Sequence, residues 1–211
     1  MRPIIGYYDY WVVLTYLSAV SAIFGVCFAF DGNIKYALVC LMISGLCDTL
    51  DGRVARLKKR NDRELNYGIQ IDALADLVSF GVLPAAIGYS VMQSLDNFGT
   101  LHIVILSLYV LAALIRLAYF NVIEAELQGR KQKRKYYVGM PVTIVSLIIP
   151  FAYTVCYLFE AAFPTVYNVL LVIITVAFVL KVKIPAPSNR VKFILCLIGL
   201  PVIIYIIWYM I

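Results

Sequence analysis

The sequence DTLDGRVAR at residues 48–56, followed after a basic connector by GIQIDALAD at residues 68–76, decides how the rest of the chain is interpreted. Both stretches lie in segments that are otherwise apolar enough for a bilayer, yet together they contain four acids. These acids are Asp48, Asp51, Asp72 and Asp76. Because a charged side chain inside a membrane is unfavourable, acids in such segments indicate a function rather than ordinary packing.

Helical spacing places the acids of each stretch on one helix face, together with small residues. The first face, spaced i, i+3, i+4 and i+7, holds Asp48, Asp51, Gly52 and Ala55. The second face, spaced i, i+4, i+8 and i+11, holds Gly68, Asp72, Asp76 and Ser79. Two such helices can converge on one polar pocket, where several like charges require cations. Oxygen ligands suit hard divalent ions, so the sequence predicts a site for Mg²⁺ or Mn²⁺.

The composition is that of an integral membrane protein. Of the 211 residues, 63% are hydrophobic and only 14% are charged, and the mean hydropathy is +0.90. We expect a single membrane-embedded domain over residues 1–211, with no room for a soluble one. The five cysteines lack metal-binding spacing and are expected to be packing thiols.

The apolar segments predict an all-α bundle of about seven transmembrane helices. The expected spans are residues 11–30, 33–57, 67–92, 101–122, 139–159, 164–180 and 191–211. Lysines and arginines cluster in the connectors after the second, fourth and sixth spans. The other connectors contain a single basic residue, Lys35. By the positive-inside rule the N-terminus is then cytoplasmic, and the four aspartates lie near the cytoplasmic interface. The net charge of +6 is expected to attract anionic headgroups and phosphates rather than nucleic acid.

The two acidic stretches together read D-x2-D-G-x2-A-R, a connector, then G-x3-D-x3-D. This pattern resembles the defining motif of the CDP-alcohol phosphotransferases, with every fixed position filled. The resemblance implies a six-helix core plus one helix, and a homodimer. It also implies roles for the motif residues. The metal ligands would be Asp48, Asp51, Asp72 and Asp76, and the CDP-lipid would be bound by Gly52, Ala55, Arg56 and Gly68. The resemblance also implies two divalent ions and a general base at Asp76. In the first span, only Leu14 and Thr15 match the family's pattern, which also contains an asparagine.

Three further fragments resemble one subgroup, the phosphatidylserine synthases. They are SFGVLPA at residues 79–85, RLAYFN at 116–121 and GMPVT at 139–143. This resemblance implies transfer of a phosphatidyl group from CDP-diacylglycerol to the hydroxyl of L-serine, at the cytoplasmic face of the plasma membrane. The residues expected to contact serine or phosphate are Ser79, Arg116, Asn121, Arg134 and Lys135. Pro84 is expected to bend its helix near Phe80 and Gly81.

Several alternatives stay open at the level of sequence. The acceptor could be glycerol 3-phosphate, although a phosphate-bearing acceptor favours a denser basic pocket. A membrane prenyltransferase usually has two Asp-rich motifs far apart, whereas these four acids fall within 29 residues. A cation transporter commonly shows repeated halves, which this sequence lacks. The acids could also be paired with arginines, and Arg116 could serve only to balance their charge.

Overall fold

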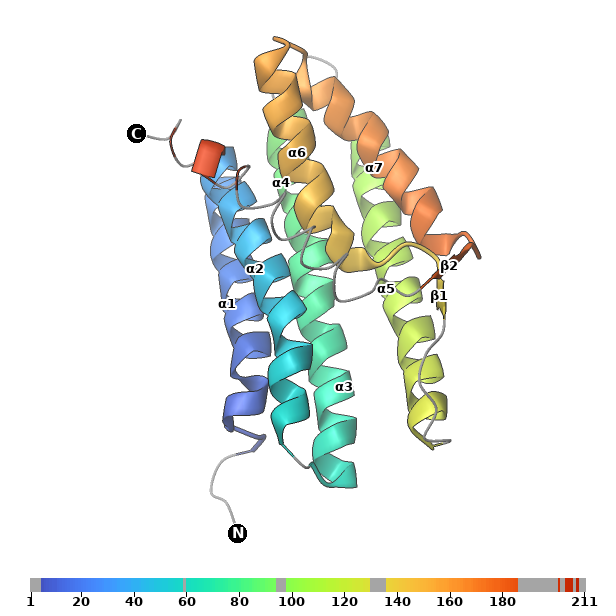
Figure 1. Cartoon of the computed structure of the whole chain (residues 1–211). Coiled ribbons are helices and arrows are strands. Elements are labelled where there is room, and N and C mark those ends of the chain that lie inside the picture. Colours follow the sequence, from blue (N-terminus) through green and yellow to red (C-terminus); the bar gives the residue numbers. More distant parts are fainter. Residues whose placement is uncertain are drawn as a thin grey trace.

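The computed structural model describes residues 5–58, 60–93, 98–129 and 136–185, together with 201, 204–206 and 208 near the C-terminus. These residues form a bundle of helices (Figure 1). The α-helices are α1 (Tyr10–Phe30), α2 (Ile34–Val54), α3 (Asp62–Asp76), α4 (Leu83–Met92), α5 (Thr100–Gly129), α6 (Val145–Leu158) and α7 (Phe163–Val179). The shorter elements are η1 (Ala55–Leu57), η2 (Leu77–Val82), η3 (Val142–Ile144) and the strands β1 (Tyr136–Val138) and β2 (Lys183–Pro185).

The expectation of a helical, multi-pass membrane protein is confirmed. In the described part of the chain, Tyr10–Phe30, Asp62–Met92 and Thr100–Ile123 are long and apolar enough to cross a membrane, and Val142–Leu158 and Phe163–Val179 are shorter apolar helices. Among the described residues, the fold departs from all-α at β1 and β2, which pair antiparallel. The count of seven spans and the cytoplasmic N-terminus stay predictions, and most of the expected last span lies outside the described residues.

Helices α1 and α2 form a close antiparallel pair (Figure 1). The pair is joined by polar contacts inside the apolar interface: the Ser18 hydroxyl donates to the Ser44 carbonyl at 3.3 Å, and the Ser44 hydroxyl donates to the Ser18 carbonyl at 3.0 Å. A Cβ added at Gly25 would lie 2.8 Å from Leu83 and 2.9 Å from the Cβ of Cys40. A glycine at this position therefore lets α1 approach α2 and α4 together.

Helices α3 and α4 are one continuous rod interrupted by the π-helical turn η2. Pro84 has no amide hydrogen to donate to the carbonyl of Phe80, four residues earlier. The hydroxyl of Tyr109, from α5, donates to that carbonyl instead, at 2.7 Å. The distortion expected around Phe80 thus takes the form of a π-turn that a tyrosine from another helix stabilises.

The remaining helices cover the rod. The hydroxyl of Tyr167, from α7, donates to the carbonyl of Pro84 at 2.7 Å, so α7 is held against the start of α4. Helix α6 meets α2 so closely that a Cβ at Gly45 would lie 2.1 Å from Oγ of Ser146. The buried core lies between these helices, and includes Phe80, which has no exposed surface. This packing fixes α2 and α3, the two helices that carry the acidic stretches.

Candidate metal centre

The four aspartates come together at one end of the bundle. Helix α2 supplies Asp48 and Asp51 in its last turns, and α3 supplies Asp72 and Asp76. One carboxylate oxygen from each of Asp48, Asp72 and Asp76 lies within 4.8 Å of the others. The carboxyl group of Asp48 lies beside that of Asp76, and the carboxyl group of Asp51 lies beside that of Asp72. The structure thus brings together the acids that the sequence pattern placed on two separate helix faces.

The donor set fits a divalent cation. It consists of carboxylate oxygens alone, which are the ligands that Mg²⁺ and Mn²⁺ prefer. Asp51 is 8% exposed and Asp76 is 9% exposed, so these carboxylates are largely removed from water. Several carboxylates at such short separations repel one another unless a cation or a proton offsets their charge. Asp48, Asp72 and Asp76 form the group that could hold an ion, and Asp51 adjoins it through Asp72.

A residue of the first helix also reaches the acids. The hydroxyl of Thr15, in α1, donates to Oδ2 of Asp51 at 3.3 Å, and Thr15 is buried. Thr15 was not among the predicted site residues, although the Leu14-Thr15 pair matched part of the family's first-span pattern. Its partner is 36 residues away in the sequence, so no local spacing could have identified the contact.

The small residues of the motif occupy different environments. Gly52, at the end of α2, is exposed, and Ala55 is half-buried in η1. A Cβ at Gly68 would lie 3.0 Å from a guanidinium nitrogen of Arg60 and 3.3 Å from the indole of Trp11. Gly68 therefore also serves packing, because it leaves space for Trp11 and Arg60 beside α3. Arg56 lies in η1, but its side chain is outside the part that the structure describes.

The described residues that are expected to contact serine or phosphate lie in η2 and α5. Ser79 is fully buried in η2, three residues beyond Asp76, and its hydroxyl lies 3.1 Å from that of Ser18. Arg116 is buried in α5, with its guanidinium carbon 5.8 Å from the ring centroid of Phe120. Asn121 is half-buried, one turn further along α5. The other two candidates, Arg134 and Lys135, lie outside the described residues.

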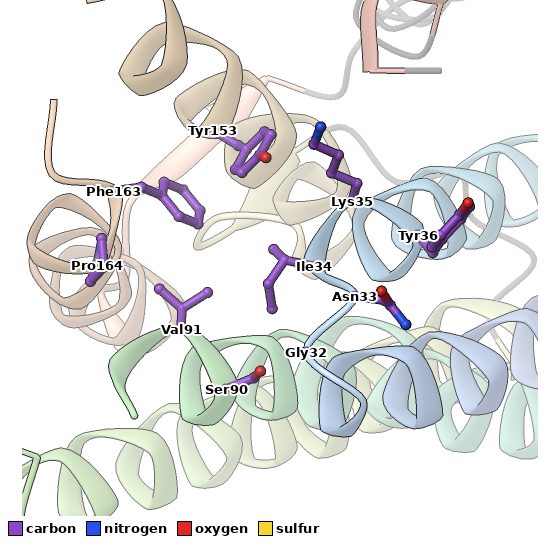
Figure 2. A pocket seen from close by; sticks show the side chains of 10 residues that line it. All are labelled: Gly32, Asn33, Ile34, Lys35, Tyr36, Ser90, Val91, Tyr153, Phe163 and Pro164. Atoms are coloured by element: carbon purple, nitrogen blue, oxygen red, sulfur yellow. The ribbon is translucent and has the colours of Figure 1, made fainter. Parts of the chain in front are cut away.

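A separate cavity of about 580 Å³ lies at the other end of α2 (Figure 2). Its wall combines aromatic and aliphatic side chains with one ammonium group. The lining residues are Gly32, Asn33, Ile34, Lys35, Tyr36, Ser90, Val91, Tyr153, Phe163 and Pro164. The predicted site residues are absent from this lining, so the cavity is distinct from the candidate metal centre.

Comparison with known proteins agrees with the motif. The profile of the CDP-alcohol phosphatidyltransferase family matches residues 12–182. The chain is 44% identical over 119 residues to the CDP-diacylglycerol–serine O-phosphatidyltransferase of Saccharomyces cerevisiae, covering 54% of this chain and 40% of the yeast protein. It is 34% identical over 128 residues to the enzyme of the same name from Mycobacterium leprae, covering 61% of this chain and 41% of that protein.

An archaeal relative extends the comparison. The archaetidylserine synthase of Methanothermobacter thermautotrophicus is 32% identical over 137 residues, which cover 65% of this chain and 54% of that protein. The chain thus spans about half the length of the curated relatives it matches. No solved structure matches it. The family profile covers most of the chain and includes both acidic stretches, and the chain therefore belongs to the CDP-alcohol phosphatidyltransferase family.

Proposed function

We propose that this protein transfers the phosphatidyl group from CDP-diacylglycerol to the hydroxyl of L-serine, forming phosphatidylserine and CMP. The observation that carries the proposal is the meeting of Asp48, Asp72 and Asp76, whose carboxylate oxygens lie within 4.8 Å of one another at the junction of α2 and α3. The names of the relatives from yeast and Mycobacterium leprae support serine as the acceptor. The nucleotide half of the substrate follows from membership of the family.

In this proposal, Asp48, Asp51, Asp72 and Asp76 hold the divalent cations. Bound Mg²⁺ or Mn²⁺ ions, expected as a pair, supply positive charge that offsets the pyrophosphate and the departing CMP. Gly52 and Ala55 have little or no side chain, so the cytidine diphosphate group can approach the end of α2 closely. The guanidinium of Arg56 has the planar fork that suits phosphate oxygens.

Asp76 has a second role as the general base. Its carboxylate takes the proton from the serine hydroxyl as the serine oxygen attacks the phosphorus that carries the diacylglycerol group. A new phosphorus–oxygen bond forms to serine, and the bond from this phosphorus to the oxygen of CMP breaks. The position of Asp76 supports this role, because it is 9% exposed and one of its carboxylate oxygens lies within 4.8 Å of oxygens of Asp48 and Asp72.

Serine itself carries a carboxylate, which requires a cation or polar donors. Arg116 and Asn121, both in α5, are the described candidates, and Arg134 and Lys135 come after α5 in the sequence. Ser79 already contacts Ser18, so we assign it a supporting position beside Asp76 rather than a direct contact. In this proposal the reaction takes place at the cytoplasmic face of the plasma membrane, where a water-soluble amino acid and a lipid can both arrive.

The test is an acceptor competition with purified protein. Given CDP-diacylglycerol, Mn²⁺ or Mg²⁺, and labelled serine, the protein should release CMP and form labelled phosphatidylserine. Glycerol 3-phosphate and inositol phosphate, supplied in equal amounts, should not compete. Preferential formation of phosphatidylglycerophosphate would reassign the acceptor, and no CMP release with any acceptor would contradict the proposed enzyme.

A further inference from the structure

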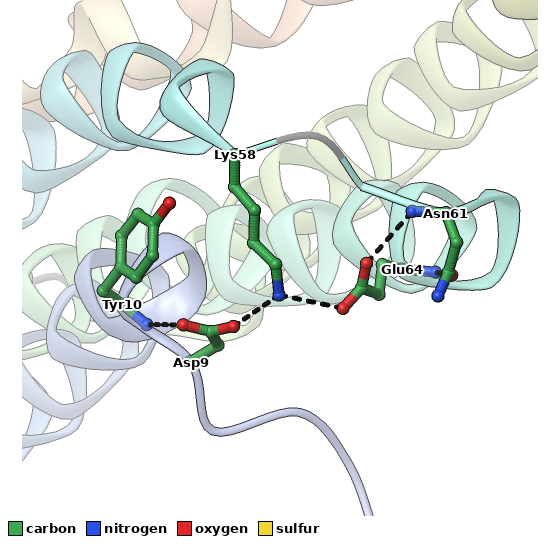
Figure 3. A network of polar contacts seen from close by, with 5 residues as sticks. All are labelled: Asp9, Tyr10, Lys58, Asn61 and Glu64. Atoms are coloured by element: carbon green, nitrogen blue, oxygen red, sulfur yellow. Dashed lines mark hydrogen bonds and ion pairs between the residues drawn. The ribbon is translucent and has the colours of Figure 1, made fainter.

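One ammonium group joins the ends of three helices beside the acidic group. Lys58 follows η1, at the end of α2, and its Nζ donates hydrogen bonds to Asp9 and, at 3.0 Å, to Glu64 (Figure 3). Asp9 directly precedes α1, and Glu64 lies in the first turn of α3. These three residues, which we call the clamp, are separate from the four aspartates of the motif.

Both carboxylates of the clamp also hold the start of a helix. Oδ1 of Asp9 accepts from the backbone amide of Tyr10 at 2.8 Å, which caps α1. One oxygen of Glu64 accepts from the amide of Asn61 at 3.0 Å, and the side chain of Asn61 accepts from the amide of Glu64 at 2.8 Å. This reciprocal pair is a capping box. Lys58 thus binds two carboxylates whose other oxygens are fixed to the backbone of α1 and α3.

The three clamped helices are those that contribute residues to the candidate metal centre. Helix α1 supplies Thr15, α2 supplies Asp48 and Asp51, and α3 supplies Asp72 and Asp76. From Glu64 to Asp72 the rise along α3 is roughly 12 Å, at about 1.5 Å per residue. A tilt or slide of α3 at its first turn therefore changes the separation between its carboxylates and those of α2.

We propose that Lys58 is a positioning residue, which sets the spacing of the two pairs of aspartates and so the affinity of the site for divalent cations. This inference rests on the metal site of the proposed function. Hydrogen bonds to Asp9 and then to Glu64 raise the pKa of Lys58. A raised lysine pKa means that the Lys58 ammonium is charged at every pH below the ordinary lysine pKa and loses its proton only in more alkaline solution. The clamp also requires that the carboxylates of Asp9 and Glu64 stay ionised, so strong acid disrupts it as well.

The clamp is suited to positioning rather than to overall stability. The side chains of Lys58, Asp9 and Glu64 are 27%, 36% and 11% exposed, and ion pairs that water reaches contribute little to stability. A second contact, between the hydroxyls of Tyr16 in α1 and Tyr67 in α3 at 2.8 Å, holds the same helices without Lys58. A variant without the ammonium should therefore fold.

The test measures Mn²⁺ binding to the full chain in detergent by electron paramagnetic resonance, without substrate. Lys58→Met should weaken Mn²⁺ binding by about threefold to tenfold, less than the loss typical for a residue that hydrogen-bonds a metal ligand directly. Lys58→Arg should restore most of the affinity, because its guanidinium can bind both carboxylates. Lys181→Met, which removes an exposed lysine between α7 and β2, is the matched control and should bind Mn²⁺ as the parent does.

Two further variants separate the clamp from the helix caps. Asp9→Asn and Glu64→Gln keep an oxygen for the backbone amides but remove the charge that Lys58 binds, so each should weaken Mn²⁺ binding as Lys58→Met does. Combined with Lys58→Met, neither should add a further loss. If Lys58→Met does not fold, Asp9→Asn and Glu64→Gln by themselves test the effect of the clamp on Mn²⁺ affinity.

The outcomes distinguish the clamp from the metal site itself. Unchanged Mn²⁺ affinity in Lys58→Met, with weakened binding in Asp48→Asn, would overturn the clamp and leave the proposed function intact. A fall in melting temperature that accounts for the lost affinity, without rescue by arginine, would also overturn it. Absence of Mn²⁺ binding by the parent protein would overturn both.

Discussion

At the scale of single residues, Asp76 combines two properties that are ordinarily unfavourable together: closeness to other carboxylates and burial away from water. It contacts Asp48 within a group of carboxylates, and it is nearly excluded from water. A carboxylate in this position can share a cation with its neighbours and still accept a proton from a substrate held beside it. The proposed role of Asp76 thus depends on its neighbours as much as on its own carboxylate.

Replacing this carboxylate should separate chemistry from binding. We expect Asp76→Asn to lower turnover by about 10²- to 10⁴-fold, the usual contribution of a general base. Binding of the CDP-lipid, measured by calorimetry with Mn²⁺ present, should remain detectable because the other three aspartates are retained. Asp31→Asn, at the exposed turn after α1, is the control and should keep full turnover. Substantial activity in Asp76→Asn would remove this residue from the role of base.

Thr15 tests whether α1 takes part in the site. Thr15→Val preserves the shape of the side chain but removes the hydroxyl that donates to Asp51 at 3.3 Å. Since partners of metal ligands orient them, the Mn²⁺ concentration for half-maximal activity should rise about tenfold. In the control Thr175→Val, the lost hydroxyl bonds only the Leu171 carbonyl of its own helix, and the metal requirement should not change. Equal metal requirements in the two variants would mean that Thr15 only packs.

At the scale of elements, the π-turn η2 is the feature that joins the acidic helix to the core. It begins directly after Asp76, and its irregular backbone depends on Tyr109 for the hydrogen bond that Pro84 cannot supply. An unsatisfied carbonyl in an apolar interior costs free energy, so this hydrogen bond contributes more to stability than one at the surface. The position of Asp76 is therefore coupled to α5 through η2.

Removing the hydroxyl of Tyr109 should show how much η2 depends on its hydrogen bond. Tyr109→Phe leaves the Phe80 carbonyl without its donor, and we expect the free energy of unfolding to fall by about 1–3 kcal/mol. Thermal unfolding in detergent measures the loss as a lower melting temperature. Tyr119→Phe, on the exposed side of α5, is the matched control and should melt as the parent does. A melting temperature for Tyr109→Phe equal to that of the control would show that η2 stands without this bond.

At the scale of the whole molecule, one bundle holds together carboxylates that repel one another. Where neither a cation nor a proton offsets their charge, this repulsion destabilises the fold, whereas ions that bind only the folded state stabilise it. Packing at Gly25 and Gly45 offsets part of the repulsion, because helices in close contact resist separation. Global stability should therefore respond to divalent ions.

Metal addition gives the corresponding prediction. Mn²⁺ at about a hundred times its dissociation constant should stabilise the parent protein by about 2.7 kcal/mol, seen as a higher melting temperature. EDTA should reverse the shift. Asp72→Asn should abolish most of it, because one of the three grouped carboxylates is then neutral. An identical shift in Asp72→Asn would place the responsible ion elsewhere on the protein.

The sequence by itself determined the helical, membrane-embedded class and singled out the four aspartates as candidate metal ligands. Both are properties of single segments, since length, hydropathy and helical spacing are written along one stretch of chain. The family followed from the same residues, because the motif is a fixed spacing within residues 48–76. The expected disturbance before Pro84 was local too, as it arises from one missing amide hydrogen.

Only the tertiary structure decided which residues from different helices meet. The contact of Thr15 with Asp51, the hydrogen bond from Tyr109 to Phe80 and the bridge from Lys58 to Asp9 join residues 29 to 49 positions apart. Such pairs depend on how one helix is rotated and shifted against the next, which close packing of side chains sets. The periodicity of a single helix contains no information on that rotation, so the sequence supplied the acids and the fold supplied their supporting partners.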